Sequence, residues 1–466
     1  MRLSYNEIAE CLGLLPCADN PELTCAVTDS RQTFPGSLFV CIPGSRADGH
    51  AFASMAVDRG AAALLVSADV AESRVPVLRV ADTVRALGRI AALWRTRTRA
   101  RVVGVTGTAG KTTVKEVLSG VLSVRGRTAQ NAMNYNNQIG MPRSVLEADG
   151  QEDFWVMELG ISHDGDMDEL ASVLRPDMGL IVNAGTGHAE GLGAKGVAWH
   201  KARLLAHLAD CGEGLVCADY PDLVREAQAT GAKLHLFSAA GQEAAYCASY
   251  IGPVGGEDDP DAPESPKGRY ALWLGGTRHE VVAPFRGAYG AENVAATGAA
   301  AFLLGLSPEE IATGFRQAHL PPQRFSQRRW GAWLLMDDTY NANPLSMRRM
   351  LAAAAEMAGG RHFVAVLGEM LELGCQAESE HYLLGRNLAE LKPSAVFWKG
   401  GQGAAVRLGL SEGGYQGPWM EVTAAPDFLH AWSEMQGSVL SGSGGVVLFK
   451  GSRSTRVEDF LEIFRA

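Results

Sequence analysis

Paired cysteines are missing from this sequence of 466 residues. No two of its eight cysteines have the C-x-x-C spacing that is typical of zinc sites and redox-active pairs. This spacing argues against a zinc framework and against the disulfide framework of a small secreted protein. The thiols, at positions 11, 17, 25, 41, 211, 217, 247 and 375, indicate a reducing compartment, so we expect a cytoplasmic protein.

Long hydrophobic runs and a surplus of basic residues are also missing. No apolar stretch approaches the roughly 20 residues that span a bilayer, and the N-terminal segment MRLSYNEIAECLGLLPC lacks the layout of a signal peptide. The 52 acidic residues outnumber the 42 basic ones, which gives a net charge of −10. We therefore expect no membrane insertion and no nucleic-acid partner. A local basic pocket for an anionic substrate is still compatible with this balance.

The length suits about three domains, and no internal repeat is visible. Residues 1–98, 99–317 and 318–466 each alternate short apolar runs with helical patterns, which predicts three α/β domains, and the repeated strand-loop-helix pattern of the central one predicts a parallel sheet covered by helices. Expected strands of the central domain include Val102–Thr106, Phe154–Glu158 and Gly179–Asn183. The two prolines of AHLPPQRF mark the second boundary.

Two further segments have readable local signals. Ser307-Pro308-Glu309-Glu310 predicts a helix start, with serine as N-cap, proline at the first helical position and Glu310 closing a capping box. IGPVGGEDDPDAPESPK, at 251–267, is rich in Pro, Gly and acidic residues, which predicts a solvated surface insertion.

A candidate phosphate-binding loop lies in RVVGVTGTAGKTTVKEVL, residues 101–118. The common pattern G-x-x-x-x-G-K-[ST] would place a glycine at position 105, which is Val105 here. The context nevertheless fits, because a strand ends at Thr106 and a helix opens at Lys111. We call residues 107–113 the phosphate loop and expect backbone N–H groups and Lys111 to bind phosphate, with Thr112 on Mg²⁺. The alternative is a glycine turn with a surface lysine.

Polar residues follow the next two predicted strands, where open parallel sheets have their sites. Glu158 ends one strand, and Asn183 and His188 follow the other. With Thr112 they could hold Mg²⁺ beside a triphosphate, since carboxylate and hydroxyl oxygens are its natural ligands. Taken singly, Glu158 is equally compatible with a solvated strand-end acid, whereas His188 is better explained as a capping or loop histidine than as a metal ligand. Lys201 has no signal of its own beyond a helical surface lysine.

Together these motifs resemble the Mur ligase family over nearly the whole chain. TDSRQTFPGSLFVCIPGSRADGHAFASMAVDRGAAALLV, residues 28–66, looks like a uridine-nucleotide-binding segment, and GVTGTAGKTT is similar to the family's own phosphate loop. NYNNQIGMP, ELGISHDGDM and NAGTGHAEGLG follow in the family's order. DDTYNANPLSM, VLGEMLELG and FKGSRS, in residues 337–454, resemble the branch that adds D-alanyl-D-alanine.

The resemblance implies three domains: an N-terminal domain for a UDP-linked substrate, a central ATP-binding domain of the P-loop type and a Rossmann-like C-terminal domain. It further implies ATP-dependent amide formation between D-alanyl-D-alanine and the terminal carboxylate of a UDP-N-acetylmuramoyl-tripeptide. The carboxylate would first be converted to an acyl phosphate, whose leaving group is phosphate. The enzyme would act as a monomer on these two small-molecule substrates in peptidoglycan precursor synthesis.

The resemblance also implies a role for individual residues. Lys111 would bind the β- and γ-phosphates, Thr112 and Glu158 one Mg²⁺, and His188 a second. Lys201 would be a carbamylated lysine that organises the metals. The nucleotide would be bound by the phosphate loop (Gly107, Thr108, Ala109, Gly110, Lys111, Thr112 and Thr113), with Asn293 on adenine, Arg324 on the γ-phosphate and Asp338 on the ribose. Ser30, Arg31, Asn136 and Asn137 would contact the UDP-linked substrate, and Asn341 and Asn343 would line the dipeptide's entry.

The sequence departs from the family in two places. Glu292-Asn293 stands where the family often has His-Asn, with Ala296 where a second Asn is common, and Arg203 closely follows Lys201. The nearest alternative is a related amide ligase of the same architecture, which adds one amino acid to a UDP-muramoyl peptide or glutamate to folate. An alternative from a different class is a P-loop NTPase switch or binding module. The YNANP and LGEMLELG motifs disfavour the related ligases, and ATP turnover without a peptide carboxylate would favour the switch.

Overall fold

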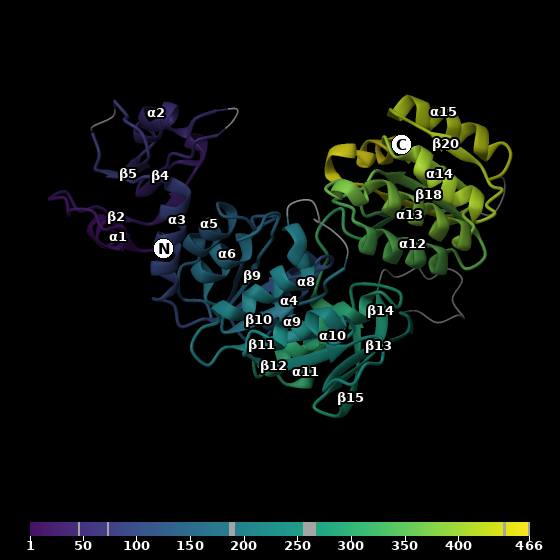
Figure 1. Cartoon of the computed structure of the whole chain (residues 1–466), viewed down its shortest axis with the longest axis horizontal. Helices are drawn as coiled ribbons and strands as arrows, with labels where there is room; N and C mark the ends of the chain where they lie inside the picture. The colour runs from purple at the N-terminus through teal and green to yellow at the C-terminus, as the bar shows by residue number, and fades with distance from the viewer. Residues whose placement is uncertain (45–46, 72–73, 186–191, 255–266, 441–443, 465–466) are drawn as a thin grey trace.

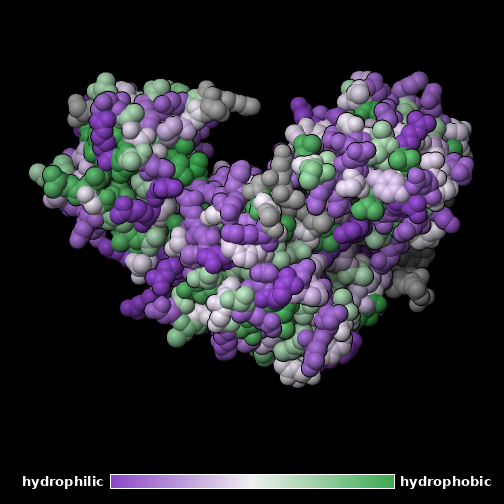
Figure 2. Space-filling model, in the orientation of Figure 1, coloured by the Kyte–Doolittle hydropathy of each residue, from purple (hydrophilic) through white to green (hydrophobic). Residues whose placement is uncertain are grey.

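The computed structural model describes residues 1–44, 47–71, 74–185, 192–254, 267–440 and 444–464. The chain forms three domains in sequence order, each built on its own sheet. In Figure 1 the N-terminal domain lies at the upper left, the central domain at the bottom and the C-terminal domain at the upper right. Figure 2 shows a notch in the outline between the N-terminal and C-terminal domains.

The N-terminal domain is a four-stranded parallel sheet, in the order β3-β4-β5-β6, with a two-stranded antiparallel ribbon of β1 and β2. Apolar residues of α1 and α3 cover one face of the sheet, and α2 covers the other. The elements are β1 (Leu3–Ser4), α1 (Tyr5–Leu12), β2 (Glu22–Leu23), β3 (Cys25–Val27), a 3-10 turn (Ser30–Gln32), β4 (Ser37–Val40), a 3-10 turn (Gly49–Phe52), α2 (Ala53–Asp58), β5 (Ala61–Val66), β6 (Val77–Arg79) and α3 (Thr83–Arg95).

The central domain has a nine-stranded sheet in the order β15-β14-β13-β12-β11-β10-β7-β9-β8. It is parallel from β8 to β13 and antiparallel at the β13-β14-β15 edge. Its elements are β7 (Arg101–Thr106), α4 (Lys111–Leu122), β8 (Thr128–Gln130), α5 (Gly140–Glu147), β9 (Phe154–Glu158), α6 (Asp166–Leu174), β10 (Met178–Ile181), a 3-10 turn (Gly193–Lys195), α8 (Gly196–Ala202), a 3-10 turn (Arg203–His207), β11 (Glu213–Cys217), α9 (Pro221–Gln228), β12 (Lys233–Ser238), β13 (Tyr246–Pro253), β14 (Gly268–Leu274), β15 (Thr277–Ala283), α10 (Gly290–Leu303) and α11 (Pro308–Gln317).

Two apolar clusters cover the two faces of the central sheet. One joins the sheet to α5, α6 and α9, and it continues without interruption into α1 and α3 of the N-terminal domain. The other joins the sheet to α4, α10 and α11. The N-terminal and central domains therefore share one continuous core.

The C-terminal domain has a six-stranded sheet in the order β16-β17-β21-β18-β19-β20, parallel except at the β16-β17 edge. One cluster packs α12, α13 and α14 on one face, and a second packs α15 and the last 3-10 element on the other. The elements are β16 (Ser326–Trp330), β17 (Trp333–Asp337), α12 (Pro344–Ala358), β18 (His362–Gly368), a 3-10 turn (Gly374–Gln376), α13 (Ala377–Leu391), β19 (Ala395–Lys399), α14 (Gly403–Glu412), β20 (Trp419–Glu421), α15 (Ala425–Gln436), β21 (Gly445–Lys450) and 3-10 elements at Arg453–Thr455 and Val457–Phe464.

The three-domain α/β fold confirms the expected class, and the strand Phe154–Glu158 has the predicted bounds. The expected strand Gly179–Asn183 ends earlier, at Ile181. Ser307 caps α11 as expected, in a capping box with Glu310. The last element of the chain, Val457–Phe464, is a 3-10 helix rather than an α-helix. Within the described residues, no helix combines the length and apolar character needed to cross a membrane. Most of the acidic insertion, residues 255–266, lies outside the described residues.

Candidate active site between the central and C-terminal domains

The phosphate loop joins β7 to α4 at the carboxyl edge of the central sheet. Gly110 has a left-handed backbone (φ +79°), and a Cβ there would lie 2.8 Å from the Asn293 side-chain oxygen, so only glycine fits without strain. No side chain caps α4 at Gly110. Because the first N–H groups of a helix have no partner within it, this end of α4 can bind an anion.

The absent glycine at position 105 has a structural explanation. Val105 is fully buried inside β7 and pairs with Leu180 of β10 and Glu158 of β9. The chain turns only after Thr106. A valine is favoured at this position because it lies in a strand that is buried on both faces.

Two lysines converge on a single backbone oxygen of the loop. Lys111 Nζ and Lys201 Nζ each donate to Gly107 O at 2.8 Å. Lys201 comes from α8 and is 2% exposed. Burial lowers the pKa of Lys201 well below its ordinary value, and the nearby Lys111 charge lowers it further. Burial also lowers the pKa of Lys111, which Glu158 partly opposes. The site has a concentration of positive charge that favours an anion.

Glu158 is held at the end of β9 by several side chains and is 2% exposed. Thr112 Oγ1 donates to one carboxylate oxygen at 2.6 Å, and Asn136 Nδ2 donates to the other at 2.8 Å. Asn131, just after β8, accepts from the Glu158 N–H and donates to its carbonyl oxygen. The hydroxyl of Thr112 and the carboxylate therefore lie side by side, a pair of oxygen donors that suits Mg²⁺.

The C-terminal domain contributes Arg324 to the same group. Its Nη2 donates to Thr112 Oγ1 at 3.0 Å, and the guanidinium lies 4.1 Å from the centroid of the Tyr340 ring. Gln323 and Phe325, on either side, both have left-handed backbones (φ +60° and +56°). Such non-glycine conformations cost about 1–3 kcal/mol each and persist where the surroundings enforce them. Here they aim Arg324 into the site.

The YNANP segment borders the loop from the other side. Asn343 caps α12 through the Ser346 N–H, and its Nδ2 donates to Thr108 O at 3.2 Å. Asn341 accepts from Lys450 Nζ through its carbonyl oxygen at 2.9 Å. Lys450 also forms a short ion pair with Asp338, whose other oxygen accepts from the Phe325 N–H.

These groups line a cavity of about 520 Å³, a size typical of small-molecule sites. Asn293, from α10, is 5% exposed, and its side-chain oxygen has no hydrogen-bond partner among the residues that the structure describes. The lining residues include Thr108, Ala109, Gly110, Lys111, Thr112, Thr113, Asn136, Asn137, Glu158, Asn293, Arg324, Asp338, Asn341 and Asn343. Most of the expected site residues therefore share one cavity between two domains.

Some of the expected site residues lie elsewhere. Ser30 and Arg31 are not among the residues that line the cavity. Ser30 is buried against Met55, and Arg31 is exposed and paired with Asp29 at 2.7 Å. Lys201 and Gly107 are also not among the lining residues, and Lys201 contacts the phosphate loop at the Gly107 carbonyl oxygen. His188 lies outside the described residues.

Sequence reasoning missed several residues of the site. Asn131 had no recognisable signal, because its role depends on the approach of β8 to β9. Lys450 was within the quoted FKGSRS segment but had no role assigned to it. Arg349 lies on α12 and forms an ion pair with Glu292, 2.7 Å away in the central domain. No sequence pattern links these last two residues.

Known proteins match this chain along its length. Family models match residues 22–95 (Mur ligase family, catalytic domain), 105–301 (Mur ligase middle domain) and 323–453 (Mur ligase, glutamate ligase domain). The chain is 33% identical over 440 residues to a UDP-N-acetylmuramoyl-tripeptide--D-alanyl-D-alanine ligase of Escherichia coli, covering 94% of this chain and 92% of the relative. The enzyme of the same name from Bacillus subtilis is 29% identical, and the match covers 93% of this chain and 92% of the Bacillus subtilis enzyme.

Solved structures agree with the sequence comparisons. A crystal structure of MurF from Acinetobacter baumannii superposes with a TM-score of 0.87 at 28% identity, covering 100% of this chain and 99% of that one. The order of the three domains, the phosphate loop between β7 and α4, and these matches have one explanation. This chain belongs to the Mur ligase family.

Proposed function

We propose that this chain is an ATP-dependent ligase that joins D-alanyl-D-alanine to the terminal carboxylate of UDP-N-acetylmuramoyl-tripeptide. The observation that carries the proposal is the pairing of the phosphate loop with the YNANP segment across one cavity. The E. coli relative that bears this activity in its name matches over 94% of the chain, which supports the same conclusion. The product would be a peptidoglycan precursor.

The chemistry requires activation of a carboxylate. An amine does not displace oxide from a carboxylate at neutral pH, so one carboxylate oxygen first attacks the γ-phosphorus of ATP and ADP leaves. The acyl phosphate that results is attacked by the dipeptide's amine at its carbonyl carbon, and phosphate then leaves as the amide forms. Phosphoryl transfer needs positive charge and alignment more than covalent help. Lys111 and Arg324 would supply this charge at the phosphates.

Magnesium fits the residues that are present. The hydroxyl of Thr112 and the carboxylate of Glu158, 2.6 Å apart, are the ligand types that Mg²⁺ prefers. His188 would hold a second ion. Bound Mg²⁺ would reduce the repulsion between the substrate's carboxylate and the triphosphate. Asn136 and Asn131 would hold Glu158 in place through the contacts described above.

A carbamate on Lys201 fits the same site. As an ammonium group, Lys201 would share the Gly107 carbonyl oxygen with Lys111 in a buried environment, where two like charges repel strongly. Carbamylation would replace that positive charge with a negative one beside the metals. We therefore propose that the buried amine is modified by CO₂ in the active enzyme.

The remaining residues would bind the substrates. Asn293 has a buried oxygen with no partner in the described part of the chain, which suits a contact to the exocyclic amine of adenine. Asp338 would bind the ribose, and Asn136 and Asn137 the muramoyl part of the substrate. Ser30 and Arg31 of the N-terminal domain would bind its uridine diphosphate, so the substrate would extend across the notch in Figure 2. Asn341 and Asn343 would border the dipeptide's entry.

We further propose that the protein is a cytoplasmic monomer of three domains, with boundaries near residues 98 and 317. The eight free cysteines fit a reducing compartment. The proposed boundaries fall between α3 and β7 and at the end of α11.

The proposal is tested by offering the purified protein ATP, Mg²⁺ and UDP-N-acetylmuramoyl-tripeptide with one amine at a time. D-Alanyl-D-alanine should give the pentapeptide by mass spectrometry, whereas D-alanine, D-glutamate and a diamino acid should not. ATP turnover should require the tripeptide. Preferential coupling of a single amino acid would contradict the proposal, and so would ATP hydrolysis that is independent of any peptide carboxylate.

A further inference from the structure

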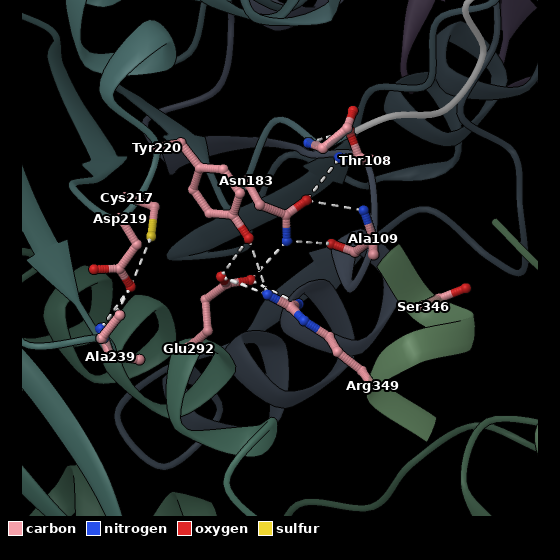
Figure 3. A network of polar contacts seen from close by, with 12 residues as sticks. Thr108, Ala109, Asn183, Cys217, Asp219, Tyr220, Ala239, Glu292, Ser346 and Arg349 are labelled. Atoms are coloured by element: carbon pink, nitrogen blue, oxygen red, sulfur yellow. Dashed lines mark hydrogen bonds and ion pairs between the residues drawn. The ribbon is translucent and has the colours of Figure 1, made fainter. Parts of the chain in front are cut away.

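Glu292 is a buried carboxylate, 4% exposed, in the first turn of α10. One oxygen accepts from Asn183 Nδ2 at 2.6 Å and from Arg349 Nη1 at 2.9 Å. The other accepts from the Tyr220 hydroxyl at 3.0 Å and from Arg349 Nη2 at 2.7 Å. A buried charge is tolerated only when it is paired and hydrogen-bonded in this way. Figure 3 shows the carboxylate between Asn183 and Tyr220 on one side and Arg349 on the other.

Asn183 carries this interaction to the phosphate loop. Its Oδ1 accepts from the Thr108 and Ala109 N–H groups, both at 2.9 Å, while its Nδ2 donates to Ala109 O at 3.0 Å (Figure 3). The carboxylate of Glu292 can only accept hydrogen bonds, so it fixes the orientation of the Asn183 amide. Nδ2 faces Glu292, and Oδ1 faces the N–H groups of the loop. An inverted amide would direct Oδ1 at a carboxylate and Nδ2 at two N–H groups, which is unfavourable at both ends.

Arg349 brings the C-terminal domain into the same network. It lies on α12, whose N-terminus also contacts the loop through Asn343. Its guanidinium is the counter-charge of Glu292, in a bidentate pair. If the C-terminal domain moves away, Glu292 is left as a buried charge without its cation, which is strongly unfavourable. The state of the carboxylate therefore depends on domain docking.

The neighbouring acids do not form a metal site. Ligand atoms of Cys217, Asp219 and Glu292 lie within 4.8 Å of one another. However, the Asp219 carboxylate accepts from Ser238 Oγ and from the Ala239 and Ala240 N–H groups. Both oxygens of Glu292 are also occupied, so the carboxylate serves the network around the loop.

We propose that Glu292 is a positioning residue that holds the phosphate loop in its nucleotide-binding shape through Asn183. Because Arg349 pairs with Glu292 only when the C-terminal domain is docked, the shape of the loop depends on that docking. The inference rests on the proposed use of ATP but not on the identity of the amine. In this chain, the closing domain shapes the loop in addition to covering it.

The test compares Glu292→Gln, Arg349→Gln and the double variant with the parent. Calorimetric titration with Mg²⁺-ADP should show affinity weakened roughly 10- to 100-fold in each single variant, as for other outer residues that orient a binding group. Amide hydrogen exchange over residues 104–114 should rise in the same variants without nucleotide. The double variant should be no worse than either single variant, because the pair acts as one unit. Arg349→Lys should recover part of the affinity.

Arg95→Gln is the matched control. It breaks another partly buried ion pair between domains, with Asp177 at 3.1 Å, that does not touch the phosphate loop. It should lower the melting temperature without changing ADP affinity or exchange in the loop. The inference is overturned if Glu292→Gln and Arg349→Gln behave like this control, with ADP affinity within about twofold of the parent, the usual error of such comparisons. Failure of the parent to couple D-alanyl-D-alanine would overturn the proposed function alone, because the exchange measurement needs no amine.

Discussion

Charged side chains lie unusually close together in the candidate active site. Lys111 and Lys201 meet at one carbonyl oxygen, and Glu158 is the carboxylate whose charge opposes the fall in their pKa values. Burial discourages charge on both amines. A site of this kind favours an anionic ligand for one lysine and chemical modification of the other.

Replacing Lys201 with methionine should lower ligase activity roughly 100-fold, because it removes the carbamate that we propose to orient the metals. Removal of dissolved CO₂ should lower the parent's activity but not the residual activity of the variant. ¹³C NMR with labelled bicarbonate should show a carbamate signal in the parent alone. Lys195→Met, at a lysine that lies over the Trp199 ring, is the control and should keep full activity. A parent without any carbamate signal would exclude the modification.

His381 should make the stability of the C-terminal domain depend on pH. It is fully buried on α13, where its ring accepts from the Met370 N–H at 3.0 Å and donates to Ala377 O at 2.6 Å, a pattern that fits only the neutral form. Burial lowers the pKa of His381 below its ordinary 6.5. Above pH 6.5 both folded and unfolded states are neutral. Below it the unfolded state binds the proton first, so stability is lost as pH falls toward the lower folded pKa.

Urea unfolding between pH 8 and 5 tests this linkage. His381→Gln should remove part of the loss of unfolding free energy on the acid side, because the amide does not titrate. His430→Gln, at an exposed histidine of α15 in the same domain, should not alter the parent's slope. An unchanged acid-side slope in His381→Gln would show that another group is responsible.

At the scale of elements, the position of the phosphate loop depends on how closely two helices pack. α11 lies against α4, the helix that the loop opens. A Cβ at Gly314 of α11 would lie 2.5 Å from the Val121 Cα of α4, so the helices approach backbone to backbone. Gly120, on α4, has more room, with a Cβ there 3.6 Å from Ala318.

Gly314→Ala should therefore destabilise the protein by about 1–3 kcal/mol, as overpacking does. Gly120→Ala is the matched control, since it adds the same methyl group to a helix without a clash. It should be neutral or stabilising by up to about 1 kcal/mol, from the higher helix propensity of alanine. Chemical unfolding measures both changes. Equal effects of the two substitutions would contradict the close approach of the helices.

At the scale of the whole molecule, the three domains are joined unequally. The N-terminal and central domains share one apolar cluster through α3, α5 and α6. The C-terminal domain has its own two clusters, and it contacts the central domain through polar pairs such as Arg324 with Thr112 and Arg349 with Glu292, with a small apolar contact between the rings of Tyr289 and Phe325. Polar interfaces between domains permit relative motion. We therefore expect the C-terminal domain, rather than the N-terminal one, to move relative to the central domain.

Truncation should reveal this difference. A chain of residues 1–317 should be soluble and melt cooperatively, because it keeps both apolar clusters of the central sheet. A chain of residues 99–466 should aggregate, since removal of α3 exposes the apolar faces of α5 and α6. Calorimetry and soluble yield measure the two outcomes. A stable 99–466 chain would show that the shared core is not required.

Much of the molecule was predictable because its signals are local. Strand and helix periodicity gave the α/β class, and Ser307 and Glu310 gave a helix start that the structure has. The phosphate loop was recognisable because strand, glycines and lysine are contiguous. The bounds of β10 were less predictable, since Val182 and Asn183 leave the ladder to approach the loop.

The sequence by itself determined the three-domain α/β fold, the phosphate loop and the family, because each depends on residues that are close in the chain. Only the tertiary structure decided which distant side chains meet. Glu292 and Arg349 are separated by a domain boundary, and Lys201 reaches the carbonyl of Gly107 from another helix. Such contacts depend on how α8, α10 and α12 pack around the loop. The same packing explains why Val105 takes the place of a glycine: there the chain is still a buried strand.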